Sequence, residues 1–297
     1  MKFCFWGFPL DYTGDLLESK NVGGSECAVF YMAQELRNRG HDVEVVDATK
    51  PDPRAAKEYD VFVAVRYPEI FNMPIKARVK VLWCHDIPVN HAEIKKVFHR
   101  IDYIFVLSYF HRDSLLHYIP EAAGKIWITS GGVDLANVEW GGEKEPGLVL
   151  YTSRPERGLE VLKGMKLPEG VRLEVTGYLE NRLTKREYYQ LLARAQLVLY
   201  PCTFPEIFCC AAVEAQASGT PIITTNEWAL RETVADPKNR INGDPRTEEY
   251  QKAFLVRVEE LLGDPKKYGE SQNIGCMSTL KFDWAGIARS WEDRLIF

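Results

Sequence analysis

Residues 21–46 of the chain read NVGGSECAVFYMAQELRNRGHDVEVV, and this stretch decides the fold. Apolar side chains recur at helical spacing over residues 28–36, Ser25 can cap the start of this helix, and Gly40 can end it. On either side lie mostly apolar runs of β-branched and aromatic residues, at 2–8 and 42–46. Such runs are typical of buried strands in a parallel sheet, so the stretch predicts a strand, a helix and a second parallel strand.

The same alternation continues along the chain. Further strands are predicted at 60–65, 79–83, 103–107 and 126–129, and then at 148–152, 171–175, 197–200 and 221–225. Helical patterns at 157–165, 184–194 and 208–218 separate the second series, and two more, at 247–262 and 283–296, close the chain. The alternation predicts an α/β fold of two Rossmann-like doubly wound domains facing a cleft, with ligands at the carboxyl ends of the strands.

A stretch rich in glycine and charged residues sets the predicted domain boundaries. We predict an N-terminal Rossmann-like domain over residues 1–132, a linker over 133–147 and a C-terminal Rossmann-like domain over 148–282. The last segment, 283–297, carries an amphipathic helical pattern with Trp284 and Trp291 on its apolar face. We expect this helix to cross back and join the two domains.

Length, composition and charge exclude several classes of protein. At about 150 residues per domain, 297 residues agree with two domains, and 46% apolar with 27% charged residues is ordinary for a soluble protein. The net charge is −5 and neither half is basic, so no nucleic-acid partner is expected. Local clusters such as Lys95, Lys96 and Arg100 could still meet anionic lipid, although nothing indicates peripheral membrane contact. Without a run of about 20 apolar residues or a signal-peptide pattern, we expect a cytoplasmic protein.

Common cofactor and metal motifs are missing from the sequence. There is no G-x-G-x-x-G after the first strand, no G-x-x-x-x-G-K-[ST] and no G-x-S-x-G, which removes the main support for a dinucleotide oxidoreductase, a P-loop NTPase or an α/β-hydrolase. The seven cysteines form no C-x-x-C, as is usual for reduced thiols, and all six histidines lie before residue 118. We expect neither a zinc site nor a resident cofactor.

Three loops after predicted strands are unusual, and the first contains Gly23 and Gly24 directly before the first helix. Paired glycines let the backbone approach a ligand closely, and free amides at a helix start can bind an anion. A plain glycine-rich turn explains the same residues, because such turns are frequent in this class of fold.

The second loop reads SRPERG and places Arg154 and Arg157 at the end of the strand 148–152. Two guanidinium groups so close together favour an anion between them, and a diphosphate fits that need. The alternative is that the arginines pair with surface carboxylates such as Glu156.

The third loop leads into an alanine-rich helix that carries Glu206 at its start and Glu214 two turns further on. At 1.5 Å per residue, eight residues along a helix separate the two positions by about 12 Å. That distance is too long for the carboxylate pair of a glycosidase, which needs about 5–9.5 Å, but it suits two hydroxyl-rich groups held apart by phosphates. A capping Glu and a solvated Glu are the alternative, although the small residues around Glu214 argue against an idle carboxylate.

The pair Glu206 and Glu214 resembles the E-x7-E motif of retaining glycosyltransferases of the GT-B fold, particularly family 4 (glycosyl transferases group 1). GGSE (23–26), VLWCHD (81–86), GGVD (131–134), SRPERGL (153–159) and EAQASGTPIITT (214–225) are similar to further segments of that family, in the family's order. The resemblance covers nearly the whole chain. It implies a hexosyl- or related glycosyltransferase that uses a nucleotide-diphosphate sugar as donor and a carbohydrate, lipid-linked or protein acceptor.

The resemblance also implies roles for single residues of the C-terminal domain. Arg154 and Arg157 would neutralise the donor diphosphate as it leaves. Glu206 would hold hydroxyl groups of the donor sugar and Glu214 those of the ribose. Phe208 and Cys209 would lend backbone amides to the donor.

In the N-terminal domain, on the acceptor side, the resemblance implies that Gly23 and Gly24 line the wall beside the phosphates and that His85 reaches the sugar or the acceptor. A buried structural histidine at a strand end is the alternative for His85. Where many family members have Glu-Gly-Phe-Gly, this chain has bulkier side chains at Ile207 and Cys209.

The chemistry implied is transfer with retention of the anomeric configuration. Arginines and a helix terminus can stabilise a leaving diphosphate without a metal, and the chain has no Asp-x-Asp motif, so we expect metal independence. Two alternatives stay open: a nucleotide-sugar epimerase of GT-B-like fold, and a catalytically idle nucleotide-sugar binding protein.

Overall fold

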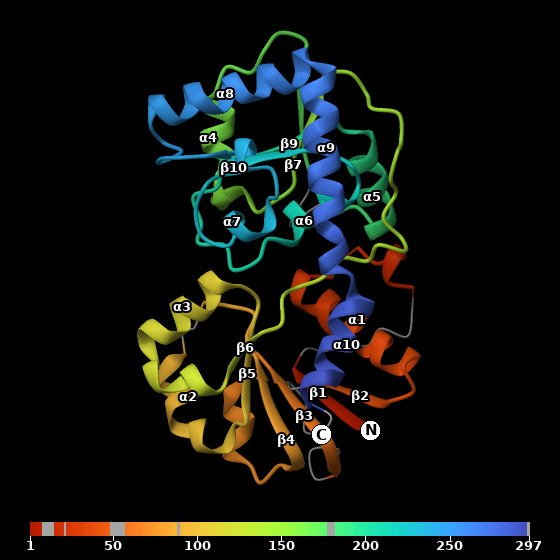
Figure 1. Cartoon of the computed structure of the whole chain (residues 1–297), viewed down its shortest axis with the longest axis vertical. Helices are drawn as coiled ribbons and strands as arrows, with labels where there is room; N and C mark the ends of the chain where they lie inside the picture. The colour runs from red at the N-terminus through yellow and green to blue at the C-terminus, as the bar shows by residue number, and fades with distance from the viewer. Residues whose placement is uncertain (8–14, 21, 48–56, 88–89, 177–181, 296–297) are drawn as a thin grey trace. The chain divides into compact units, whose positions relative to one another are not determined.

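The computed structural model describes residues 1–7, 15–20, 22–47, 57–87, 90–176 and 182–295. The chain forms two compact units (Figure 1). The first takes the described residues of 1–13, 22–132 and 284–297, and the second takes those of 14–21 and 133–283. Each unit is built on one parallel sheet. None of the described helices is long and apolar enough to span a bilayer.

The first unit contains a six-stranded sheet in the order β2-β1-β3-β4-β5-β6. Its strands are β1 (Lys2–Gly7), β2 (Asp42–Asp47), β3 (Glu58–Val65), β4 (Lys76–Trp83), β5 (Tyr103–Val106) and β6 (Ile126–Ile128). The helices are α1 (Gly24–Asn38), α2 (His91–Val97), α3 (Tyr109–Tyr118) and α10 (Trp284–Leu295). The predicted strand–helix–strand unit is confirmed as β1, α1 and β2, with Lys2 in register with Asp42. The helix is capped by Gly23 rather than by Ser25.

The second unit contains a five-stranded sheet in the order β11-β10-β9-β7-β8. Its strands are β7 (Leu148–Tyr151), β8 (Arg172–Val175), β9 (Leu197–Tyr200), β10 (Ile222–Thr225) and β11 (Arg240–Ile241). The helices are α4 (Leu159–Gly164), α5 (Lys185–Arg194), α6 (Cys210–Ala217), α7 (Leu230–Thr233), α8 (Glu248–Gly263) and α9 (Pro265–Thr279). The chain runs outward from β7 to β8 and then returns to β9 on the other side of β7, so the strand order reverses between β7 and β9.

The segment 133–147, expected as a linker, lies within the second unit. The amide of Glu145 donates to the carbonyl of Arg194 at 2.8 Å, and Lys144 Nζ donates to Thr220 Oγ1 at 2.7 Å. These contacts attach the segment to the end of α5 and to the residues just before β10.

The C-terminal helix α10 belongs to the first unit, where it completes the core. Trp291 is fully buried, its indole N–H donates to Thr129 Oγ1, and its ring meets Trp83 and Phe105 edge-on at 4.9 and 4.8 Å between ring centres. This packing is the physical reason why a segment so far along the sequence returns to the first sheet.

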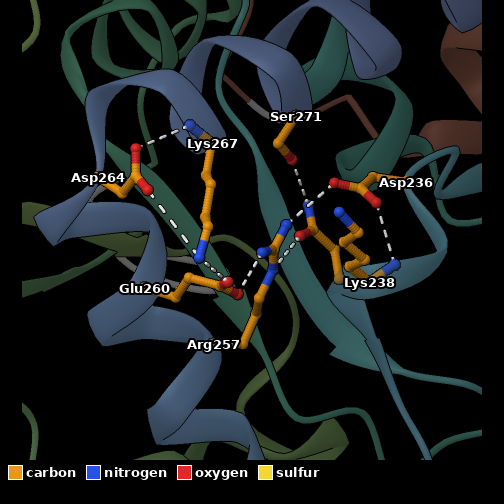
Figure 2. A network of polar contacts seen from close by, with 8 residues as sticks. Asp236, Lys238, Arg257, Glu260, Asp264, Lys267 and Ser271 are labelled. Carbon is orange, nitrogen blue, oxygen red and sulfur yellow. Dashed lines mark hydrogen bonds and ion pairs between the residues drawn. The ribbon is translucent and has the colours of Figure 1, made fainter.

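A buried polar network joins α8 and α9 to the segment before β11 (Figure 2). Arg257 of α8 donates to Asp236 at 3.0 Å, to Asn239 at 2.9 Å and to Glu260 at 2.6 Å. Only 5% of Arg257 is exposed, and these partners offset the cost of burying its charge. Lys267 of α9 closes the network onto Glu260 at 2.6 Å.

Candidate functional site

The reversal of strand order in the second sheet brings two of the expected residues into direct contact. Arg157 follows β7 and Glu206 follows β9, and these strands are neighbours although 49 residues separate the two positions. Arg157 Nη1 donates to Glu206 Oε1 at 2.8 Å. Glu206 is 5% exposed, so a buried carboxylate and a guanidinium share the crevice where sheets of this kind bind ligands.

Glycine at position 158 allows the arginine loop to approach β9. Gly158 has φ 135°, and a Cβ atom there would collide with the carbonyl of Pro201. The amide of Thr203 donates to the carbonyl of Arg157 at 3.0 Å, and the Tyr151 hydroxyl donates to the carbonyl of Arg154 at 2.7 Å. Gly158 could not be predicted from the sequence, because a lone glycine after a strand does not reveal its backbone contact.

The two arginines of this loop have different environments. The side chain of Arg154 is about half exposed and lies 3.9 Å from Glu156, which agrees with the surface pairing considered as an alternative. Arg157 is more enclosed, with its guanidinium 4.1 Å from the centre of the Phe204 ring. Burial alone would lower the pKa of Arg157, but Glu206 raises it above the usual value, so this guanidinium stays charged.

Glu206 does not lie on the alanine-rich helix, which corrects the spacing argument. Helix α6 begins at Cys210, four residues after Glu206, so the separation of about 12 Å along one helix axis does not apply to Glu206 and Glu214. Cys209 caps the helix with φ 67°, the left-handed region in which glycine is unstrained. This turn separates Glu206 from the helix that carries Glu214.

The amides before α6 are available to a ligand. Within the described chain, the backbone N–H groups of Phe208 and Cys209 donate no hydrogen bond, and the helix N-terminus behind them favours negative charge. Burial, followed by the charge of Glu206, raises the pKa of the Cys209 thiol well above its usual value, so this cysteine is a neutral thiol.

Glu214 is buried on α6 and pairs with a residue that the sequence argument missed. Lys185 Nζ donates to Glu214 Oε1, and the Tyr189 ring centre lies 4.9 Å from the ammonium. Lys185 is the first residue of α5, where the helix dipole opposes a positive charge. A lysine directly after the capping Thr184 was therefore the available signal, because a cation is disfavoured there unless it has a partner.

The remaining expected residues lie in the first unit. Gly23 has an extended backbone with φ −80°, and Gly24 is the first residue of α1. The carboxylate of Glu26 lies beside Gly23, where a Cβ atom would collide with it. The backbone here is not left-handed, and a side chain at position 23 would first have to displace the carboxylate of Glu26.

His85 follows β4, and its ring is almost fully buried. The residue is 8% exposed, its ring meets that of Trp83 edge-on at 4.4 Å, and its Nε2 atom is buried without a hydrogen-bond partner in the described chain. Burial, and then the nearby charge of Arg66, lowers the pKa of His85 well below its usual value. A buried ring nitrogen without a hydrogen bond is uncommon, so the structural alternative leaves this atom unexplained.

Among the described residues, no three His, Cys, Asp or Glu side chains are grouped closely enough to hold a metal ion. The expected site residues thus form two groups, one in each unit. Gly23, Gly24 and His85 lie in the first, and Arg154, Arg157, Glu206, Phe208, Cys209 and Glu214 lie in the second.

The fold and the second unit place the chain in a recognisable class. Residues 163–273 match the family Glycosyl transferases group 1, and the fold of the whole chain is the GT-B fold of glycosyltransferases.

Particular proteins share this fold over the whole chain. Sucrose-phosphate synthase of Thermosynechococcus elongatus has a TM-score of 0.77 at 15% identity, covering 99% of this chain and 98% of that one. HepE of Anabaena, solved in complex with UDP, has a TM-score of 0.75 at 18% identity, covering 99% of both chains. HepE was also solved in complex with UDP-glucose.

A curated relative matches over a shorter stretch. The lipopolysaccharide 1,2-N-acetylglucosaminetransferase of Salmonella typhimurium is 24% identical over 102 residues. The match covers 34% of this chain and about a quarter of that protein, 26% of its length.

Proposed function

We propose that the chain is a retaining glycosyltransferase that moves a sugar from a nucleotide-diphosphate sugar to a hydroxyl acceptor without a metal ion. The observation that carries this proposal is the contact between Arg157 and Glu206 where the strand order of the second sheet reverses. In a nucleotide sugar, the diphosphate and the sugar hydroxyls are adjacent. A site for a nucleotide sugar therefore needs a guanidinium group for the diphosphate next to a carboxylate for the sugar hydroxyls.

The leaving diphosphate would be stabilised by fixed positive charge. Arg154 is exposed at the loop surface, Arg157 stays charged, and the amides of Phe208 and Cys209 stand before the N-terminus of α6. Preorganised donors of this kind lower the barrier most where charge develops in the transition state. They support metal independence because they supply the positive charge that a metal would otherwise provide.

Two further groups would recognise the ends of the substrates. Glu214, which pairs with Lys185, would accept hydrogen bonds from the ribose hydroxyls. In the first unit, Gly23 and Gly24 would allow close approach of the phosphates, and the unused Nε2 of neutral His85 would bond a hydroxyl of the sugar or the acceptor.

In the reaction, the bond between the anomeric carbon and the diphosphate oxygen breaks, and the acceptor oxygen forms a new bond on the same face of the sugar. The acceptor proton passes to a departing phosphate oxygen, so no protein nucleophile is needed. This course gives retention of configuration. Arg154 and Arg157 would disperse the charge that remains on the nucleoside diphosphate.

Because HepE was solved in complex with UDP and with UDP-glucose, these are the first ligands to test. We expect UDP-glucose, or its GDP or ADP counterpart, to raise the melting temperature, because a ligand at 100 times its Kd adds about 2.7 kcal/mol. The enzyme should then release the nucleoside diphosphate slowly without an acceptor, and EDTA should leave the rate unchanged. Loss of that rate on EDTA treatment would contradict metal independence.

Single substitutions test the assigned roles. Glu206→Ala and Arg154→Ala should each lower the release rate at least about 100-fold, because each removes a charged contact to the reacting part of the donor. Glu156→Ala, in the same loop but without an assigned role, is the control. If both site variants keep the normal rate, the roles are wrong. Conversion of the donor to an isomer would identify an epimerase, and unchanged donor would identify a binding protein.

A further inference from the structure

Tyr200 is the last residue of β9, and it touches the candidate site through its hydroxyl. The residue is 2% exposed, and its hydroxyl donates to Glu206 Oε1 at 2.6 Å. Behind it, Ser153 Oγ donates to the Tyr200 oxygen at 3.2 Å. Ser153 begins the arginine loop, so a chain of hydrogen bonds runs from that loop through Tyr200 to Glu206.

The direction of this chain is fixed by the chemistry of its members. Burial, and then the negative charge of Glu206, raises the pKa of the Tyr200 phenol well above its usual value. The phenol therefore stays protonated and donates a hydrogen bond to Glu206, while its oxygen accepts a hydrogen bond from Ser153. A neighbouring phenol of this kind restrains a carboxylate without competing with it for charge.

The two oxygens of Glu206 are used unequally. Oε1 accepts from both Arg157 and Tyr200, at 2.8 and 2.6 Å. Within the described residues, Oε2 accepts no hydrogen bond. One oxygen is therefore anchored by two donors, and the other is left for a group that does not belong to the protein.

We propose that Tyr200 is a positioning residue that, supported by Ser153, fixes Glu206 Oε1 so that Oε2 receives a hydroxyl of the donor sugar. The inference rests on the proposed function, in which Glu206 holds the sugar. It adds that Tyr200 acts on the sugar part of the donor and leaves the nucleotide part unaffected.

The test compares two ligands that differ only in the sugar. Calorimetry would measure the Kd of UDP and of UDP-glucose for the wild type, Tyr200→Phe and Ser153→Ala. We expect Tyr200→Phe to weaken UDP-glucose at least about 10-fold, as befits the loss of a hydrogen bond to a charged group, and to change UDP less than about twofold. Ser153→Ala should raise the ratio of the UDP-glucose Kd to the UDP Kd by about two- to threefold, in the same direction as Tyr200→Phe.

The control is Tyr268→Phe, which removes a hydroxyl that donates to the carbonyl of Gln196 at 2.9 Å, away from Glu206. It should change the binding of neither ligand. If Tyr200→Phe lowers the affinities for UDP and UDP-glucose equally, or lowers neither, the inference is overturned while the proposed function stays intact. If Tyr200→Phe does not fold, an unchanged ratio in Ser153→Ala overturns it. A wild type that binds neither UDP nor UDP-glucose, nor their GDP and ADP counterparts, would overturn both proposals.

Discussion

At the scale of single residues, the candidate site depends on backbone conformations that cannot be predicted from the identity of the side chains. Gly158 and Cys209 both have positive φ, and each lies directly beside a residue or an amide assigned to the donor. Gly158 brings Arg157 to β9, and Cys209 turns the chain into α6. These two turns place the arginine loop and the helix N-terminus at the same sheet edge.

Gly158→Ala should be destabilising by more than about 2 kcal/mol, because φ 135° strains any residue with a side chain and the added Cβ would meet the backbone of Pro201. Urea unfolding measures the loss. The matched control is Gly164→Ala at the end of α4, where an added Cβ meets nothing within 4 Å. Equal effects of the two substitutions would contradict the role given to Gly158.

Lys185→Met should also be destabilising, by about 3 kcal/mol, because it leaves the buried carboxylate of Glu214 without its cation. Adding Glu214→Gln to Lys185→Met should recover part of the loss, which a double-mutant cycle in urea would show. Lys163→Met removes a lysine whose side chain is about half exposed and paired with Glu160, and it should cost little. Additive effects at 185 and 214 would argue against the pair.

At the scale of elements, buried polar groups hold helices to the sheets. Arg257 holds α8 to the segment before β11, and His111 holds α3 to the loop after β4. The His111 ring donates from Nε2 to the carbonyl of Asp86 at 2.8 Å and accepts at Nδ1 from the amide of Leu107 at 3.3 Å. The two hydrogen bonds of His111 together require the neutral ring, with a proton on Nε2 and none on Nδ1.

Arg257→Met should lower the free energy of unfolding by about 3 kcal/mol, because Asp236 is then buried without its cation (Figure 2). Arg246→Met provides the control, since Arg246 is largely exposed and paired with exposed Asp244. Denaturant titration followed by circular dichroism checks both. A change below about 1 kcal/mol for Arg257→Met would mean that the network adds little to stability.

His111 predicts how stability depends on pH. Burial lowers its pKa from 6.5 to about 4, so the unfolded chain binds a proton at pH values where the folded chain does not. The contribution is complete above pH 6.5 and is lost as pH falls toward 4. Urea unfolding at several pH values should give a shallower slope for His111→Gln than for the wild type. His99→Gln, at an exposed position, should keep the wild-type slope.

At the scale of the whole molecule, alternating strands and helices were enough to predict both parallel sheets, except for the two-residue strand β11 at the edge of the second. The strands were found because they are buried on both faces and therefore apolar throughout, as in residues 61–65 and 197–200. Helix α9 was missed because its sequence, PKKYGESQNIGCMST, has two glycines and few apolar residues. No periodic pattern in the sequence indicated that residues 15–20 belong to the second unit.

The candidate site was predictable in part. Strand-end loops pointed to Arg157 and Glu206, because carboxyl ends of parallel strands share an edge. Their direct contact was not predictable, since it depends on which strands are neighbours. Tyr200 gave no signal in the sequence, because its contact with Glu206, 6 residues away, forms only in the folded sheet. Lys185 was marked by its place after Thr184, but its partner Glu214, 29 residues away, was not.

The return of α10 to the first unit has a consequence for biosynthesis. Trp291 fills the space between Trp83 and Phe105, yet it leaves the ribosome after every residue of the second unit. All residues of the second unit are synthesised before α10. Until α10 is made, the core of the first unit lacks the side chain of Trp291. Chaperones that shield apolar surface would therefore be expected to engage the nascent N-terminal half for as long as the rest of the chain is being made.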